Sequence, residues 1–364
     1  MYSKYSELLN YFYSLRREGV KMGLEHTIEL FKKIGNPHKN LELIHIAGTN
    51  GKGSCSALIE NILRISGKKV GLYTSPHLIN YNERIRVDGI PIKNSEIISF
   101  IERNQCYIKN IKSTFFEVST AMAIDYFSKK SVDVAVVETG LGGRLDSTNI
   151  IKPKLSIITE ISLDHLDILG DTILKIAKEK SGIIKEKTPV VISRQLKEVT
   201  ELFLKRAIEK SSQLTEVFEV LKVKLSQKGT TFRYRGKDYK TSLIGEHQAH
   251  NASLVIESMK IYDSSIPEVI IDRGLKGVFW AGRMQKIYKK IFFDVAHNKK
   301  SIKSLISTTK TLFPNLPIYG LFCLKGDKEL GIIAEEISKV FDQLFVCDDK
   351  NKFLLKKEIL SKKL

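Results

Sequence analysis

A glycine-rich segment with one lysine and one hydroxyl carries the strongest chemical signal in this sequence. It covers residues 48–54, follows an apolar run typical of a buried strand, and precedes apolar residues at helical spacing. In such a strand–loop–helix unit, backbone N–H groups and the helix N-terminus attract a phosphate, and Lys52 adds a full positive charge. The usual loop places a hydroxyl directly after the lysine, whereas here Gly53 separates Lys52 from Ser54. The segment predicts phosphate binding rather than an ordinary tight turn.

Polar side chains also follow other apolar runs that are predicted to be strands. Ser75 follows one such run, Glu138 ends another, and residues 160–165 follow a third. Ligands of open parallel sheets bind at the carboxyl ends of the strands, so these groups should surround the phosphate loop. An acid in this position holds magnesium in nucleotide hydrolases. Strand ends are often polar only because they leave the core, but the combination favours a nucleotide–magnesium site.

Lys180 occupies an unexpected position in a helix predicted over residues 171–186. The apolar stripe of that helix includes Ile173, Ile176 and Ala177, and Lys180 continues it. A lysine buried there would have a lowered pKa and a reactive neutral amine. The alternative is a buried aliphatic stem with the amine in water, and the residue pattern alone slightly favours that alternative.

Three further groups of polar residues are weaker candidates. His247 and His250 have the spacing of a metal-binding pair, but no acid at helical spacing completes a site, so we do not expect a metal there. Asn251, on the same predicted helix, is either a purine contact or a surface residue. Residues 294–298 are either ligand contacts at a domain cleft or a polar turn whose asparagine caps the next helix.

The order of the predicted elements indicates an α/β fold with a doubly wound, mostly parallel sheet. Strands alternate with helices until residues 217–244, which form a small antiparallel unit. The α/β rhythm restarts near residue 282, which predicts a smaller, Rossmann-like C-terminal domain. We therefore expect one domain at 1–281 and a second at 282–364. Arg283, beside this boundary, could extend to a phosphate, although surface arginines are common.

Composition indicates a soluble globular protein. Hydrophobic residues make up 42% of the 364 residues and charged residues 27%. The four cysteines have no metal-site spacing, no signal peptide is visible, and no apolar run approaches the roughly 20 residues needed to span a bilayer. These features predict a cytoplasmic monomer that binds no membrane.

The net charge of +18 raises the hypothesis of a basic P-loop NTPase that binds nucleic acid. The lysines do not interleave with aromatic residues in one stripe, and no nucleic-acid motif is present. We therefore expect no nucleic-acid partner, and a positive field that attracts anionic small molecules such as ATP.

Together these motifs resemble the Mur ligase superfamily, and within it the folylpolyglutamate synthase/dihydrofolate synthase family. The matching segments keep the family order from residue 19 to about residue 330. They are residues 21–25, 45–54, 74–78, 82–85, 116–117, 138–149, 163–165, 179–183, 282–283 and 294–298. The phosphate loop and the run 138–149 are specific to this branch, since other Mur ligases usually place the hydroxyl directly after the lysine.

The resemblance implies an ATP-dependent amide ligase. ATP would phosphorylate a carboxylate of dihydropteroate or a reduced folate, and the amine of L-glutamate would displace phosphate from the acyl phosphate. It also implies two magnesium ions, K⁺ as a further cation, and a carbamate on Lys180, which a buried neutral amine could form with CO2. The residues expected to act in catalysis are Lys52, Glu138, His165, Lys180 and His297.

The family's binding residues carry over to the matching positions. ATP would be held by Asn50, Gly51, Lys52, Gly53, Ser54, Asn251, Arg283 and Asp294. Ser75 and Glu138 would bind the first magnesium, and His165 the second. The pterin would be bound by Val20, Lys21, Met22, Gly23, Phe116, Glu117, Leu145, Asp146 and Ser147.

The C-terminal end departs from the family pattern. The chain stops at Leu364 after about three predicted strands of the second domain, whereas family members usually continue. We therefore expect the last strands to be absent or the domain to be reduced. The alternatives are another Mur-type amino-acid ligase, the basic NTPase, and a nucleotide-binding protein without activity. Residues 21–25 and 138–149 argue against a ligase of cell-wall precursors, but the sequence does not separate dihydrofolate synthase from polyglutamate synthase.

Overall fold

The computed structural model describes residues 2–15, 23–326, 330–337, 340–349 and 354–364. Its main element is an eight-stranded sheet with the order β4-β3-β2-β5-β1-β6-β7-β8. Strands β2, β5, β1, β6, β7 and β8 are parallel, whereas β3 and β4 form an antiparallel edge. The strands are β1 (Leu43–Ala47), β2 (Val70–Tyr73), β3 (Ile85–Val87), β4 (Ile90–Pro91), β5 (Val134–Glu138), β6 (Leu155–Ile158), β7 (Val190–Ile192) and β8 (Leu214–Glu216). The predicted doubly wound, mostly parallel sheet is confirmed.

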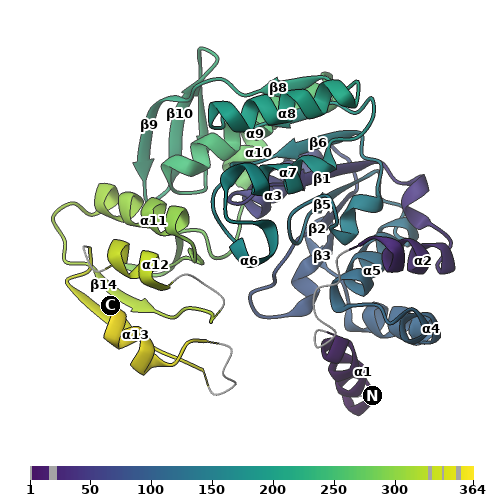
Figure 1. The fold of residues 1–364 in the computed structure, drawn as a ribbon. Helices are drawn as coiled ribbons and strands as arrows, with labels where there is room; N and C mark the ends of the chain where they lie inside the picture. Colours follow the sequence, from purple (N-terminus) through teal and green to yellow (C-terminus); the bar gives the residue numbers. More distant parts are fainter. Residues whose placement is uncertain (1, 16–22, 327–329, 338–339, 350–353) are drawn as a thin grey trace.

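Helices cover both faces of this sheet, so β1 and β5 are buried throughout (Figure 1). Alternate residues such as Ile44 and Val136 pack with α3, α9 and α10, while Leu43 and Val137 join the opposite core with α2, α4 and α5. A third core joins β6 and β7 to α7 and α8. The helices are α1 (Tyr2–Ser14), α2 (Glu25–Lys33), α3 (Lys52–Ile65), α4 (Asn94–Ile111), α5 (Phe115–Lys129), α6 (Leu166–Leu169), α7 (Ile173–Lys180), α8 (Lys197–Glu209), α9 (Glu246–Tyr262) and α10 (Glu268–Gly277).

The predicted antiparallel unit and the restart of the α/β rhythm are both present. The three-stranded sheet has the order β11-β10-β9, and the later elements form an antiparallel pair, β12 with β13, and a parallel pair, β14 with β15. Helix α11 lies beside the antiparallel unit and faces α6 (Figure 1). These elements are β9 (Leu221–Ser226), β10 (Gly229–Tyr234), β11 (Lys237–Thr241), β12 (Gln285–Tyr288), β13 (Ile291–Phe293), α11 (Lys299–Leu312), β14 (Tyr319–Phe322), α12 (Leu330–Ile337), β15 (Gln343–Val346) and α13 (Lys357–Lys363).

The prediction of one helix over residues 171–186 is wrong. Helix α7 ends at Lys180 and a 3₁₀ turn follows over Ser181–Ile183. The carbonyl oxygen of Gly182 accepts a hydrogen bond from Asn149, and that of Ile183 accepts one from Ser156. Tertiary partners therefore satisfy the carbonyl groups that a longer helix would have paired within itself.

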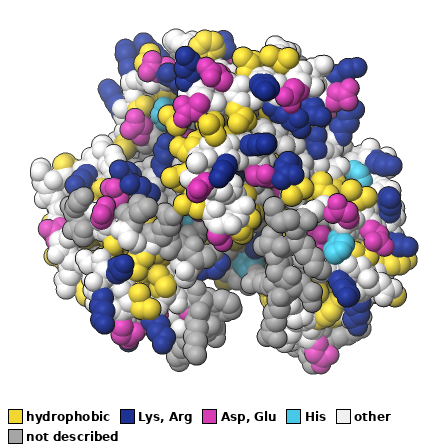
Figure 2. All heavy atoms as spheres, in the orientation of Figure 1, with side chains coloured by type: hydrophobic (Ala, Val, Ile, Leu, Met, Phe, Trp, Pro, Cys, Tyr) yellow, Lys and Arg dark blue, Asp and Glu magenta, His cyan; other side chains and the backbone are white. Residues whose placement is uncertain are grey.

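Two surface properties bear on the predicted partners. Figure 2 shows Lys and Arg side chains distributed over the drawn face, with Asp and Glu between them, rather than gathered in one stripe. Among the described residues, no helix combines the length and apolar character needed to cross a bilayer. The absence of nucleic-acid and membrane partners stays a prediction, as does the domain boundary at residue 282.

Candidate active site

A cavity of about 740 Å³ lies at the carboxyl ends of the parallel strands, between the main sheet and the start of α11. Most of the residues predicted from the sequence line it. They are Asn50, Gly51, Lys52, Gly53, Ser54, Ser75, Phe116, Glu117, Glu138, Leu145, Asp146, Ser147, His165, Lys180, Asn251, Arg283, Asp294 and His297. Gly23 does not belong to the lining, and Val20, Lys21 and Met22 lie outside the described residues.

The phosphate loop joins β1 to α3. Gly51 precedes the helix with φ +90°, a conformation that favours glycine, and a Cβ atom there would overlap Oδ1 of Asn251 unless that side chain moved. The Nζ of Lys52 donates to the carbonyl oxygens of Gly48 and Thr49, at 3.1 Å each. The lysine therefore folds back over its own loop, with its charge at the cavity wall.

Lys180 is buried, with 4% of its surface exposed, so the slight preference for an amine in water is wrong. Its Nζ donates to the carbonyl oxygen of Gly48 at 2.8 Å. Burial, and to a smaller extent the charge of Lys52, lower the pKa of Lys180 to about 7, while Asp164 and Asp146 oppose the shift. A large share of this amine is therefore neutral near pH 7, which is the form that acts as a nucleophile.

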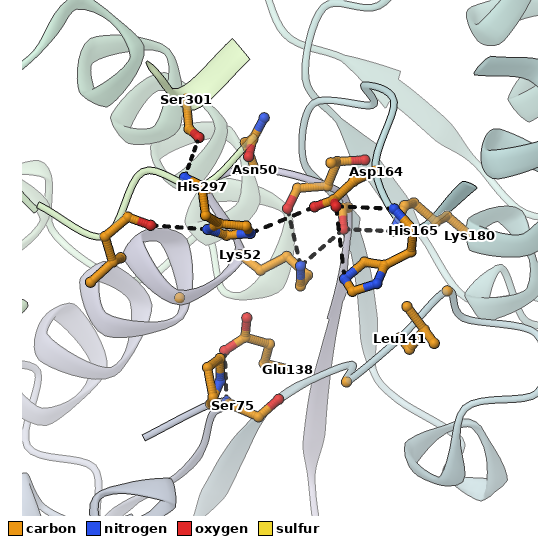
Figure 3. Close-up of a pocket in the computed structure, with 18 of the residues that line it drawn as sticks. Asn50, Lys52, Ser75, Glu138, Leu141, Asp164, His165, Lys180, His297 and Ser301 are labelled. Carbon is orange, nitrogen blue, oxygen red and sulfur yellow. Dashed lines mark hydrogen bonds and ion pairs between the residues drawn. The ribbon is translucent and has the colours of Figure 1, made fainter. Parts of the chain in front are cut away.

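Glu138 ends the buried strand β5 and points into the cavity (Figure 3). Burial raises the pKa of its carboxyl to about 7, although Lys52 and the backbone N–H of Ser75, 3.3 Å from Oε2, favour the ionised form. A bound cation would offset the cost of charge here. The Ser75 hydroxyl and one carboxylate suit Mg²⁺, which commonly takes few protein ligands and adds phosphate oxygens. The described residues contain no group of three His, Cys, Asp or Glu arranged for a metal.

Asp164 joins the two predicted histidines, and the sequence motifs did not single it out as a site residue. Its Oδ1 accepts a hydrogen bond from the backbone N–H of His165 at 3.0 Å and lies 3.9 Å from that ring's Nε2. Its Oδ2 lies 3.7 Å from Nε2 of His297, on the other side of the cavity (Figure 3). The sequence signals for Asp164 were its place in the polar run after β6 and in the family segment 163–165.

Asp294 fixes the segment that enters the C-terminal elements. Its carboxylate accepts hydrogen bonds from the backbone N–H groups of Met284 and Ala296, both at 2.8 Å. Burial raises the pKa of Asp294, while these hydrogen bonds and Arg283 oppose the rise. Asp294 thus has structural partners as well as a place in the cavity lining.

Asn298, at the end of the same segment, confirms the helix-cap alternative for residues 294–298, whereas ligand contact there stays a prediction. Its Oδ1 accepts a hydrogen bond from the N–H of Ser301 at 2.9 Å, which caps α11. Its Nδ2 donates to Asn50 at 3.0 Å and to Asp164 at 3.2 Å. The turn is therefore both a helix cap and a contact across the cleft.

Helix α9 contributes a second wall near the phosphate loop. Asn251 donates to Gln248 at 3.0 Å, and Gln248 donates to the hydroxyl of Ser54 at 3.4 Å. Burial lowers the pKa of His247 to about 4, and its Nε2 lies 3.1 Å from Gln248. The described residues show no metal group involving this histidine or His250, and the purine role of Asn251 stays a prediction.

The predicted pterin wall is held by local hydrogen bonds. The Asp146 carboxylate accepts backbone N–H groups of Gly140 and Leu141, at 2.9 and 2.8 Å, and so fixes the loop after β5. Glu117 accepts the N–H of Thr114 at 2.6 Å and caps its own helix. The Phe116 ring packs so closely on Gly140 that a Cβ there would overlap it.

Comparison with known proteins decides the family. The model of the Mur ligase middle domain matches residues 46–259. This chain belongs to the Mur ligase family. Within the family it is 34% identical over 363 residues to folylpolyglutamate synthase of Lacticaseibacillus casei, covering 94% of this chain and 85% of the relative. It is also 34% identical over 349 residues to dihydrofolate synthase/folylpolyglutamate synthase of Bacillus subtilis, covering 90% and 81%.

Solved structures agree with this Mur ligase assignment. Mycobacterium tuberculosis folylpolyglutamate synthase complexed with ADP superposes with a TM-score of 0.92 at 31% identity, covering 99% of this chain and 86% of that chain. A folylpolyglutamate synthase–AMPPCP–folate complex gives a TM-score of 0.87 at 32% identity, covering 96% and 92%. The family resemblance drawn from the sequence motifs is therefore confirmed.

Proposed function

We propose that this Mur ligase is an ATP-dependent amide ligase that adds L-glutamate to dihydropteroate, to reduced folates, or to both. The observation that carries the proposal is the convergence on one cavity of Lys52 from the start of α3, Glu138 from the end of β5 and Lys180 from the end of α7. The named relatives support the class of reaction, and the relative solved with AMPPCP and folate supports both kinds of ligand.

The reaction has two balanced steps. A carboxylate oxygen of the pterin substrate attacks the γ-phosphorus of ATP, the bond to the β–γ bridging oxygen breaks, and ADP leaves. The glutamate amine then attacks the acyl carbon, phosphate leaves, and the amine loses a proton. Lys52 and the glycine N–H groups hold the phosphates and offset their charge, and His297 faces the transferred group.

Ser75 and Glu138 would hold one magnesium ion, and His165 would hold a second beside Lys180. Magnesium supplies charge stabilisation at the phosphate oxygens. The Lys180 amine would attack CO2 and lose one proton, which forms an N–C bond and a carbamate. The lowered pKa of Lys180, about 7, supports this step because it requires a neutral amine. K⁺ would be a further cation, and we assign it no ligands among the described residues.

We place the protein in the cytoplasm as a monomer with small-molecule substrates and no nucleic-acid partner. The proposal includes contacts to ATP from Asn50, Gly51, Gly53, Ser54, Asn251, Arg283 and Asp294. It also includes contacts to the pterin from Gly23, Phe116, Leu145 and Ser147.

The test is ADP release by the purified chain with ATP, magnesium and L-glutamate, plus either dihydropteroate or tetrahydrofolate. We expect release that requires both glutamate and one pterin substrate, and the choice of substrate assigns the activity. ADP binding without turnover would instead favour a nucleotide-binding protein. Turnover stimulated by nucleic acid and independent of glutamate would favour the basic NTPase, and turnover with a cell-wall precursor would favour another Mur-type ligase.

A further inference from the structure

Asp164 lies where the central domain meets the C-terminal elements, and it is well shielded from water. Its side chain is 11% exposed, in the loop between β6 and α6. One carboxylate oxygen makes a hydrogen bond within its own loop, because Oδ1 accepts the N–H of His165 at 3.0 Å. The other oxygen faces the C-terminal elements, with Asn298 Nδ2 at 3.2 Å and His297 Nε2 at 3.7 Å.

A purely local role would account for only one of these oxygens. A carboxylate that merely shaped its own turn would need the contact with the N–H of His165 and nothing beyond it. The second oxygen instead meets a turn 134 residues later in the chain. Asn298 can reach it because the same side chain caps α11 with its Oδ1, which leaves the Nδ2 group to point across the boundary.

Other contacts also cross this boundary, but they are of different kinds. Lys300 pairs with Glu160 at the cavity mouth, where the two side chains are 48% and 38% exposed. Water and salt weaken such an exposed pair. Asn298 also bonds to Asn50, a contact between neutral amides at 3.0 Å. The Asp164 carboxylate is better shielded than that exposed pair, and a hydrogen bond to a charged acceptor is stronger than one between neutral groups.

We propose that Asp164 is a positioning residue that holds the His297–Asn298 turn of the C-terminal elements against the His165 loop of the central domain. This inference rests on the proposed ligase function, because it assigns a cause to the placement of His165 and His297 beside one carboxylate in the cavity of the proposed reaction. Loss of Asp164 lets the C-terminal elements move away while the phosphate loop keeps its shape. Nucleotide binding then persists, and the step that needs both domains slows.

The experiment compares Asp164→Ala and Asn298→Ser in the full chain. Serine remains a good helix cap but is too short to keep the amide contacts, so Asn298→Ser removes the bridge without uncapping α11. Asp167→Ala is the matched control, because Asp167 is an exposed aspartate three positions further along the same segment. We measure ADP affinity by calorimetry, kcat and KM for each substrate, and the radius of gyration by X-ray scattering.

We expect both test variants to bind ADP like the wild type, with kcat lower by about 100-fold, the scale of an ångström-level misplacement. KM for glutamate should rise and KM for ATP should not. Their radius of gyration should increase, and the loss in the double variant should be smaller than the sum of the two single losses, because both single variants remove the Asp164–Asn298 bond. Asp167→Ala should match the wild type in every measurement.

If both variants kept the radius of gyration and the kcat of the wild type, the inference would be overturned. A large loss of kcat in Asp164→Ala with an unchanged radius of gyration would also overturn it, because Asp164 would then act within its own domain. Scattering needs no turnover, so an expanded radius in a chain without ligase activity would support the bridge while refuting the proposed function.

Discussion

Lys52 and Lys180 donate hydrogen bonds to the same acceptor, the carbonyl oxygen of Gly48, at 3.1 and 2.8 Å. Two ammonium groups at one oxygen repel each other, and Lys180 is the more deeply buried of the pair. Deprotonation of Lys180 relieves both the cost of burial and the repulsion, which is why its pKa falls to about 7. The geometry of the phosphate loop is thereby linked to the reactivity of a lysine on α7.

The first prediction concerns Lys180→Ala. If a carbamate on Lys180 supplies a carboxylate to the site, this variant loses ligase activity by about 100-fold or more, a typical effect of removing one electrostatic group. Acetate or formate, which can occupy the vacated space, should then restore part of the activity. Lys178→Ala is the control, because Lys178 is exposed on the same helix. A fully active Lys180→Ala variant would refute the carbamate.

The second prediction concerns the stability of Lys180→Met across pH. The folded pKa of about 7 lies below the ordinary value of 10.5, so between these values the unfolded chain binds more protons. Burial of the charged lysine thus lowers the free energy of unfolding of the wild type most below pH 7. The cost is about 1.4 kcal/mol for each pH unit by which the pKa is lowered. The methionine variant should be more stable than the wild type at pH 6.5. Urea denaturation should show this advantage shrinking towards pH 10, and an advantage that does not change with pH would contradict the lowered pKa.

The sheet was predictable because its strands are buried on both faces. Runs such as residues 43–47 and 134–138 are almost entirely apolar and too short for a buried helix, which is typical of parallel strands covered by helices. Short elements were not predictable from periodicity. Helix α6 spans four residues and β4 spans two, fewer than a repeat needs. The end of α7 at Lys180 depends on tertiary hydrogen bonds that no local pattern contains.

The site was predictable where chemistry and position coincide. Lys52 and Glu138 lie at the carboxyl ends of buried strands, so the topology brings them together. Asp164 and Asn298 were not recognised as partners, because their contact joins segments 134 residues apart and depends on how two domains meet. The burial of Lys180 was visible in its helical stripe, but the pattern could not exclude an amine that reaches water.

The third prediction concerns Glu138→Gln in magnesium-free buffer. Burial raises the pKa of Glu138 from 4.5 to about 7, so the ionised carboxylate destabilises the ligand-free protein above pH 7. Wild-type stability should therefore fall relative to the glutamine variant as pH rises from 4.5 to 7, and the variant should be the more stable one at pH 8. Denaturant titrations at both ends of this range measure the difference.

Ligand addition should reverse that order. Magnesium and ATP should stabilise the wild type more than Glu138→Gln, because ligand stabilisation follows affinity for the folded state. Glu186→Gln, at an exposed position, should behave like the wild type in both experiments. Equal stabilisation of the wild type and Glu138→Gln by magnesium and ATP would exclude Glu138 as a magnesium ligand.

The fourth prediction separates backbone strain from steric overlap at the phosphate loop. Gly51→Ala and Gly67→Ala both place a Cβ at positive φ, +90° and +93°, and each should cost about 1–2 kcal/mol of stability. Only at Gly51 does the new atom overlap Asn251, since no atom of the described residues lies within 4 Å of a Cβ at Gly67. ADP binding should therefore be lost or strongly weakened in Gly51→Ala alone. Equal ADP affinity in the two variants would show that Asn251 can move aside without affecting the nucleotide.

The fifth prediction concerns the pterin wall. A methyl group in Gly140→Ala would overlap the ring of Phe116, which lines the cavity, so the ring must turn away. KM for the pterin substrate should rise about tenfold, equivalent to roughly 1.4 kcal/mol, while KM for ATP stays unchanged. Gly331→Ala is the control, because a Cβ there has no atom within 4 Å in the described part of the chain. Since the Asp146 carboxylate accepts the N–H of Gly140 at 2.9 Å, the backbone there is held in place and the ring takes up most of the movement. A rise in KM for ATP instead would place Phe116 beside the nucleotide and move the pterin elsewhere in the cavity.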